Sequence, residues 1–262
     1  MRRRTDGSGR FESHSTRGGE GRRLGSDVTG MPKAMYRACG KPLLETVLEQ
    51  LDFVRKKDIY IVVGYEKEKI ISYFGDGYSY VEQKEQLGTG HAVEVCRPYF
   101  EGFDGTVLVT FGDMPLFRRG PMRELCEYRA ASGAACVLMT AENPELDMWA
   151  RIVRDGEGRF RAVVEGRDCT PEQAKIRELF SGVIAFDSRK LFAVLGEVDR
   201  DNAQHEYYLT EVPELMARRG WTVETRMTAD GDDLRGVNTP EDLRVCEEIM
   251  RRRETGVSGQ AG

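Results

Sequence analysis

The amino-acid sequence predicts an α/β fold with a mostly parallel, twisted sheet, helices on both faces, and a small β-rich subdomain. Buried-strand patterns alternate with amphipathic helical patterns up to about residue 142, which implies right-handed βαβ units. After Asn143-Pro144 the pattern changes to that of a hairpin. We therefore divide the predicted domain, residues 18–253, into a first part (18–142) and a second part (143–253).

The composition is that of a globular protein with enough apolar residues for a core: 262 residues, 40% hydrophobic and 32% charged. The net charge of -5 argues against a nucleic-acid-binding surface. No apolar run approaches the roughly 20 residues of a membrane span. The six cysteines form no C-x-x-C pair, so free thiols are expected rather than a zinc cluster. We expect a cytoplasmic protein that binds neither nucleic acid nor membranes.

Both ends of the chain are polar. Residues 1–17 are rich in Arg, Gly and Ser and are predicted to be disordered, and residues 254–262 to form a flexible tail. The next segment, residues 18–27, is dense in glycine and carries two arginines. Such a loop lets backbone N–H groups approach phosphates closely, although a flexible linker has the same composition.

The first part begins with a helix after Pro42, where proline suits the first turn. Apolar residues at helical spacing or in short β-branched runs define the rest. In order, the pattern predicts a helix (43–54), strand (58–64), helix (66–74), strand (78–81), a polar loop running into a helix (83–100), strand (106–111), helix (121–132) and strand (134–140).

The second part opens with two strands joined by Asp155-Gly-Glu-Gly158, a hairpin signature. Gly220 is the expected C-cap of a helix that ends at Arg219. The pattern predicts hairpin strands (150–154 and 158–165), a strand (181–186), a helix (188–195), a helix (207–219), a strand (221–227) and a helix (240–253).

The run from Thr106 to Phe111 is apolar and β-branched without alternation, as in a strand buried on both faces. It stops at Gly112-Asp113, and Pro115 prevents its continuation. A carboxylate is thus delivered to the carboxyl edge of the sheet, where α/β proteins bind ligands and where it is suited to hold a divalent cation against phosphates. The alternative is an aspartate in an ordinary turn before proline.

Four motifs in a fixed order make the sequence similar to a known family. They are Gln83-Lys-Glu-Gln-Leu-Gly-Thr-Gly-His-Ala92, Phe111-Gly-Asp-Met-Pro-Leu116, Asp201-Asn-Ala-Gln-His-Glu-Tyr-Tyr-Leu-Thr-Glu211 and Gly236-Val-Asn238. From about Gly18 to Arg253 the chain resembles the sugar-1-phosphate nucleotidyltransferases, most closely the uridylyltransferase domain of bacterial N-acetylglucosamine-1-phosphate uridylyltransferase. The resemblance implies a Rossmann-like fold of the nucleotide-diphospho-sugar transferase type.

The resemblance also implies a Mg²⁺-dependent reaction between UTP and a sugar 1-phosphate, first of all N-acetylglucosamine 1-phosphate. The products would be pyrophosphate and a UDP-sugar for cell-wall precursors. Transfer to another sugar 1-phosphate, or from another pyrimidine triphosphate, stays open, as does a non-catalytic nucleotide-binding protein. By position, the resemblance assigns catalytic roles to Lys33 and Arg23; nucleotide binding to Gly19, Gly21, Gln83, Gly88, Thr89 and Gly112; sugar binding to Glu165, Ala150, Phe180 and Tyr207; and Mg²⁺ binding to Asp113 and Asn238.

Each assignment has a structural alternative. Thr89 is placed to be the N-cap of a helix, and the glycines beside it to start that helix. Asn238 precedes Thr239-Pro240 and suits a helix-initiating turn. Tyr207 and its neighbour Tyr208 suit the core and rim of a helix, and we expect this of at least one of them.

The sequence departs from the family at two places. The family has an apolar strand before the glycine-rich loop, whereas residues 11–18 are polar and charged, so we expect the sheet to lack its first strand and the activity to be weak. In the sugar site, Ala150 replaces a glycine and Phe180 replaces an asparagine. No hexapeptide repeat follows residue 253, so acetyl-CoA chemistry is not expected.

Overall fold

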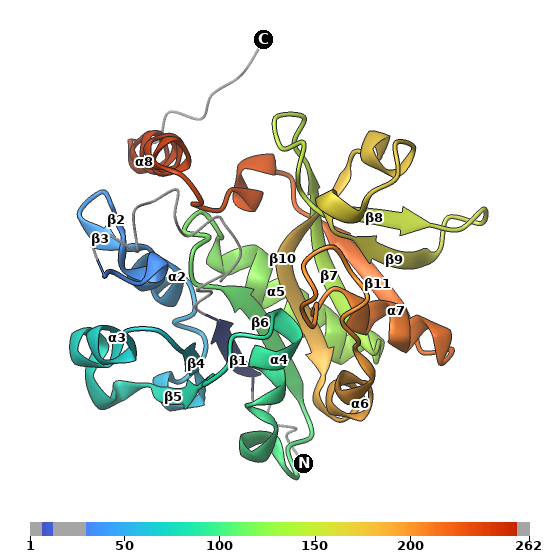
Figure 1. Cartoon of the computed structure of the whole chain (residues 1–262), viewed down its shortest axis with the longest axis horizontal. Coiled ribbons are helices and arrows are strands. Elements are labelled where there is room, and N and C mark those ends of the chain that lie inside the picture. The colour runs from blue at the N-terminus through green and yellow to red at the C-terminus, as the bar shows by residue number, and fades with distance from the viewer. Residues whose placement is uncertain (1–6, 13–29, 256–262) are drawn as a thin grey trace.

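The computed structural model describes residues 7–12, as backbone, and residues 30–255. Within them lies a nine-stranded sheet whose main path runs in the order β11-β7-β10-β6-β1-β4-β5 (Figure 1). β8 and β9 extend from β10 as a hairpin. The strands are β1 (Gly7–Glu12), β4 (Tyr60–Val63), β5 (Ser79–Glu82), β6 (Thr106–Phe111), β7 (Cys136–Glu142), β8 (Arg151–Arg154), β9 (Phe160–Val164), β10 (Glu178–Asp187) and β11 (Val223–Met227).

The sheet is mostly parallel, as the βαβ pattern predicts. β6, β1, β4 and β5 run parallel to one another, and so do β7 and β11, whereas β10 runs antiparallel between β6 and β7. β10 follows the β8–β9 hairpin in the sequence and returns the chain to the main sheet. It is therefore the strand through which the second part of the domain joins the first. A separate two-stranded ribbon pairs β2 (Arg37–Ala38) with β3 (Lys41–Pro42).

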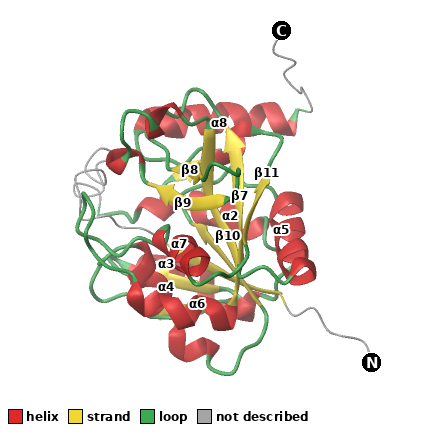
Figure 2. Ribbon diagram, turned by 90° about the vertical axis from the view of Figure 1, so that its right-hand side faces the viewer, coloured by secondary structure: helices red, strands yellow, loops and turns green. Residues whose placement is uncertain are grey.

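Helices cover both faces of the sheet, which confirms the predicted layers (Figure 2). Along β6, Val107 and Val109 belong to one apolar cluster and Leu108 to another, because successive strand residues face opposite sides. The first cluster includes residues of α4 (Thr89–Glu94), α6 (Ser188–Val194) and α7 (Glu211–Arg218). The second includes residues of α2 (Leu43–Glu49), α3 (Lys67–Phe74) and α5 (Arg119–Ser132).

The expectation of a sheet without its first strand, and of disorder throughout residues 1–17, is wrong for Gly7–Glu12. This segment is β1, and it pairs in parallel with β6 on one side and β4 on the other. Ladder hydrogen bonds come from backbone N–H and C=O groups, and a segment without proline supplies them whatever its side chains are. The Gly-rich loop with Gly19, Gly21 and Arg23 lies outside the described residues.

Helix α7 begins at Glu211, four residues later than the predicted start at Tyr207. The main chain of Tyr207 is used elsewhere: its N–H donates to the Leu87 carbonyl at 2.8 Å, and its carbonyl accepts from Gly90 N–H at 2.7 Å. These bonds to a distant segment replace those that a helix would make. The segment around Tyr207, just before α7, is therefore bonded to the loop that begins α4. We call this segment the clasp.

The last helix, α8 (Pro240–Glu254), is anchored through a buried carboxylate. Asp233 is 1% exposed, and its carboxylate accepts three hydrogen bonds. The donors are Arg118 Nη2 at 2.8 Å, Arg253 Nη2 at 3.0 Å and the Thr228 hydroxyl at 2.8 Å. Arg253 also donates to the Leu116 carbonyl at 2.7 Å. The network fixes α8 against the segment after β6, so the residues just before α8 are held near the end of that strand.

Two further features bear on the sequence expectations. The six cysteines are free thiols. Among the helices of the described residues, none is both long and apolar enough to cross a membrane.

Candidate active site

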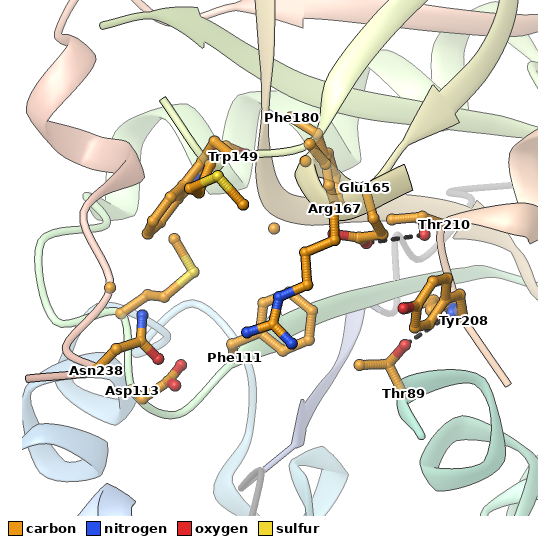
Figure 3. Close-up of a pocket in the computed structure, with 18 of the residues that line it drawn as sticks. Thr89, Phe111, Asp113, Trp149, Glu165, Arg167, Phe180, Tyr208, Thr210 and Asn238 are labelled. Carbon is orange, nitrogen blue, oxygen red and sulfur yellow. Dashed lines mark hydrogen bonds between the residues drawn. The ribbon is translucent and has the colours of Figure 1, made fainter. Parts of the chain in front are cut away.

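A cavity of about 650 Å³ opens at the carboxyl end of β6, between the first part of the domain and the β8–β9 hairpin (Figure 3). Its lining comes from segments far apart in the sequence. They are the start of α4, the end of β6, the approach to β8, the turn after β9, the middle of β10, the clasp before α7 and the turn before α8. The site thus lies at the sheet edge where Asp113 was expected to meet a ligand.

Three polar side chains converge at one end of this cavity. The ammonium of Lys33 donates to Asp113 Oδ2 and to Asn238 Oδ1, each at 2.5 Å. The side chains of Lys33 and Asp113 are 13% and 16% exposed, so the contact is largely shielded from water. Lys33 lies 80 positions before Asp113 and 205 positions before Asn238 in the sequence, and the fold brings the three side chains to one point.

The backbone explains how Asn238 reaches this point. Val237 N–H donates to the carbonyl of Asp113 at 2.9 Å, which ties the two segments together. Thr239 is the N-cap of α8 and forms a capping box with Asp242. Because Thr239 and Asp242 cap α8, the side chain of Asn238 is left to bond Lys33. The helix-initiating role that was the alternative for Asn238 is performed by these two neighbours.

The donor set at this point fits Mg²⁺. Asp113 and Asn238 offer hard oxygens that already converge on one cationic group, the Lys33 ammonium. Mg²⁺ is commonly held by one or two protein oxygens, with phosphates and water completing the octahedron. Among the residues that the structure describes, no group of three or more His, Cys, Asp or Glu is suited to hold a metal.

Of the predicted nucleotide-binding residues that the structure describes, only Thr89 lines the cavity, and its hydroxyl accepts from Leu209 N–H at 2.7 Å. The N-cap of α4 is Gly88, so the alternative of Thr89 as N-cap is wrong. Gln83 and Gly112 are buried but do not line the cavity, and Gln83 donates to the Gly88 carbonyl at 3.1 Å. In this structure Gln83 shapes the loop.

Gly88 is required by a close approach of main chain. Its φ is +111°, and a Cβ there would lie 2.7 Å from the Tyr207 carbonyl oxygen and 2.8 Å from its nitrogen. The resemblance assigns Gly88 to nucleotide binding; in this structure its lack of a side chain makes room for the main chain of Tyr207. The position of Tyr207 also differs from expectation: Tyr208 lines the cavity and Tyr207 does not.

The predicted sugar-binding residues lie at the other end of the cavity. Glu165 accepts from the Thr210 hydroxyl at 3.0 Å, and burial raises the pKa of this carboxyl above its ordinary value. Ala150 and Phe180 line the same end, are 6% and 5% exposed, and are joined by a Phe180 N–H bond to the Ala150 carbonyl of 2.9 Å.

Sequence reasoning missed several lining residues, of which Arg167 is the most informative. It follows Glu165 in the turn after β9, and Figure 3 shows its side chain extending into the middle of the cavity. Among the lining residues that the structure describes, it is the only arginine or lysine. The turn requires a glycine at Gly166, because a Cβ there would lie 2.2 Å from the Met148 carbonyl oxygen. Met148 and Trp149 were missed as well, whereas Gln204 and Glu206, which also line the cavity, belong to the family motif of residues 201–211, part of which the resemblance places beside the sugar pocket.

Comparison with known proteins agrees with this architecture. The family model of the MobA-like NTP transferase domain matches residues 17–208. The bifunctional protein GlmU of Levilactobacillus brevis is 38% identical over 90% of this chain and 50% of that protein, and GlmU of Enterococcus faecalis is 35% identical over 90% and 51%. The chain spans about half the length of these curated relatives.

Two solved structures share the fold at low identity. An apo UDP-glucose pyrophosphorylase superposes with a TM-score of 0.73 at 16% identity, covering 95% of this chain and 99% of that one. A putative glucose-1-phosphate thymidylyltransferase from Bacillus anthracis, in complex with a sucrose, gives 0.69 at 16% identity, covering 93% and 95%. These likenesses confirm the predicted fold class.

Proposed function

The chain belongs to the family of MobA-like NTP transferase domains, and from this membership and the geometry of the cavity we propose that it is a sugar-1-phosphate nucleotidyltransferase. The donor that we propose is UTP, and the first acceptor is N-acetylglucosamine 1-phosphate. The products are a UDP-sugar and pyrophosphate, formed in the cytoplasm with Mg²⁺ as cofactor for the synthesis of cell-wall precursors.

One observation carries the proposal: Lys33 bonds both Asp113 and Asn238, and these two residues line one end of a cavity of about 650 Å³. Nucleotidyl transfer demands positioning and charge stabilisation more than covalent catalysis. A lysine, a carboxylate and an amide at one point suit this demand, because the triphosphate and the acceptor phosphate together bring several negative charges into one site.

In the reaction, a phosphate oxygen of the acceptor attacks the α-phosphorus of UTP, and the bond from that phosphorus to the β-phosphate bridging oxygen breaks. Lys33 stabilises the charge that develops on the phosphate oxygens, and Arg167 binds the acceptor phosphate. Asp113 and Asn238 would hold Mg²⁺, which neutralises phosphate charge when bound. Glu165 accepts a hydrogen bond from an acceptor hydroxyl beside Thr210.

Pyrophosphate release tests the proposal directly. The purified chain, UTP and Mg²⁺ are assayed with N-acetylglucosamine 1-phosphate, glucose 1-phosphate and galactose 1-phosphate, and then with CTP, dTTP and ATP as donors. We expect turnover with UTP and at least one acceptor, and loss of that turnover in Lys33→Ala and Asp113→Ala with the fold intact by circular dichroism. Wild-type rates in both variants would contradict the site assignment.

The non-catalytic alternative rested on a missing first strand. The structure contains β1 in the middle of the sheet, which removes that reason. If the chain binds UTP but releases no pyrophosphate with any acceptor, the non-catalytic reading is correct after all.

A further inference from the structure

The cavity has two chemically different walls. One carries hydrogen-bonding side chains, Glu165, Thr210, Tyr208, Glu206 and Gln204. The other, which we call the apolar wall, consists of Met148, Trp149, Ala150 and Phe180. Figure 3 shows Trp149 on the side of the cavity opposite Thr210 and Tyr208, with Phe180 between them beside Glu165. A ligand that fills this end must therefore present a polar side and an apolar side.

The apolar wall offers few hydrogen bonds. The Phe180 N–H and the Ala150 carbonyl bond each other at 2.9 Å, and neither side chain carries a polar atom. Beside them, the Ser181 hydroxyl already accepts from Val183 N–H at 3.2 Å and has one O–H left to donate. A hydroxyl group pressed against this wall would lose its bonds to water without replacing them all. An alkyl group would gain by leaving water.

Core packing explains all of the apolar wall except Met148. Ala150 and Phe180 are buried, and Trp149 packs against two of the apolar clusters, so apolar side chains are expected at these three positions in any case. Met148, however, lines the cavity and is 63% exposed. Pockets for small molecules are lined mainly by apolar side chains, so an exposed methionine in the lining is suited to contact a ligand. The wall therefore continues outward from the core as a surface for binding.

We propose that the preferred acceptor places an alkyl group against the apolar wall. At the same position N-acetylglucosamine 1-phosphate carries a hydroxyl or only a short acyl chain. Two sources supply such a group: a deoxy carbon of the sugar ring, or an N-acyl chain longer than acetyl. The remaining hydroxyls bond the polar wall at Glu165. This inference rests on the proposed function and refines its acceptor: N-acetylglucosamine 1-phosphate remains an acceptor, and a relative of it with an alkyl group at this position is used more efficiently.

The test compares matched acceptors with UTP and Mg²⁺. One arm measures kcat/KM for 6-deoxy-N-acetylglucosamine 1-phosphate, and the other for N-butanoylglucosamine 1-phosphate, each relative to N-acetylglucosamine 1-phosphate. Burial of one methylene changes the ratio of kcat/KM values by about fourfold, and a pocket that fits the alkyl group closely changes it by about tenfold or more. We expect at least one arm to exceed about fourfold. Ratios below that in both arms overturn the proposal.

Two pairs of variants locate the effect. Met148→Gln and Phe180→Asn bring amide groups to the apolar wall, and Met148→Leu and Phe180→Leu are their apolar controls. We expect each amide variant to lower the alkyl preference by about threefold or more while its leucine control keeps it. Because Met148 is exposed, Met148→Gln is expected to fold even if Phe180→Asn does not. A preference that Met148→Gln leaves unchanged overturns the assignment to this wall.

Failure of the proposed function has a different signature. A chain that releases no pyrophosphate with any acceptor contradicts the transferase but leaves the cavity open to direct measurement. Equilibrium binding of the same three sugar phosphates in the presence of UTP then decides the inference. Tighter binding of either alkyl analogue supports it, and equal or weaker binding of both overturns it.

Discussion

The position of the Lys33 ammonium between Asp113 and Asn238 leads to a prediction with two opposite readouts. Lys33→Met keeps the length of the side chain and removes its charge. The two oxygens that now bond Lys33 at 2.5 Å would then face each other without a cation. Turnover should fall, because the charge that stabilises the phosphates is lost. Binding of a divalent cation should become tighter, because the ammonium no longer competes for the same oxygens.

Both magnitudes follow from the geometry. A positioned charge acting on the transition state contributes about 2–4 kcal/mol, so kcat should fall by roughly 30- to 1000-fold. A hydrogen bond involving a charged group contributes about 1.5–3 kcal/mol net, and Asp113 makes such a bond at a site only 16% exposed. Release of even one such bond tightens the Kd of Mg²⁺ or Mn²⁺ by about tenfold or more.

The assay pairs pyrophosphate release at saturating Mg²⁺ with calorimetric titration of Mn²⁺ into the protein without nucleotide. Lys41→Met is the matched control, because Lys41 is an exposed lysine that bonds Glu49 on the surface. We expect the control to match the wild type in both measurements. A Lys33→Met variant that loses activity but binds the metal no more tightly would show that Lys33 does not compete for these oxygens, and the reasoning would be refuted.

Three further predictions concern the surroundings of the site. Asp233→Ala should lower the free energy of unfolding in urea by about 2 kcal/mol, because it removes the buried acceptor that bonds Arg118, Arg253 and Thr228; a loss below about 1 kcal/mol would contradict this. Gly88→Ala should raise the KM for UTP at unchanged secondary structure, since its Cβ would press on Tyr207, whereas an unaltered KM would show that the clasp yields. Burial and the nearby charge of Asp199 raise the pKa of Glu211 to about 7, so the native state holds a proton that the unfolded chain releases near pH 4.5. The free energy of unfolding should therefore fall as pH rises from about 4.5 to 7. Glu211→Gln should remove this pH dependence of the urea midpoint.

Local sequence was sufficient to predict the elements whose bonding is local. The strand Thr106–Phe111 has the predicted ends, because an apolar β-branched run is stopped by Gly112 and Pro115. The hairpin of β8 and β9 likewise carries its own turn residues between its strands. The meeting of Asp113 with Asn238 was predicted by family resemblance, since nothing within either segment indicates its distant partner.

The errors occur where bonds join distant segments. The predicted start of α7 at Tyr207 is four residues too early, because the main chain of Tyr207 bonds Leu87 and Gly90. The same clasp turns Tyr208 into the cavity in place of Tyr207. β1 was missed because its side chains look unsuited to a central strand, and the pairing depends on its backbone. Arg167 was missed because an arginine in a turn is ordinary until the cavity around it is seen.

The two ends of the cavity, one at Asp113 and Asn238 and the other at Glu165 and Phe180, depend on different stretches of β10. Residues Ile184–Asp187 pair with β6, the strand that delivers Asp113, whereas Leu179 pairs with Arg151 of β8, beside the apolar wall. An irregularity in the pairing with β7 lies between Phe180 and Ile184 and separates the two stretches. Substitutions in the wall can therefore change which acceptor fits without moving the carboxylate, which is why we expect Met148→Gln to alter acceptor preference and Lys33→Met to alter turnover and metal binding.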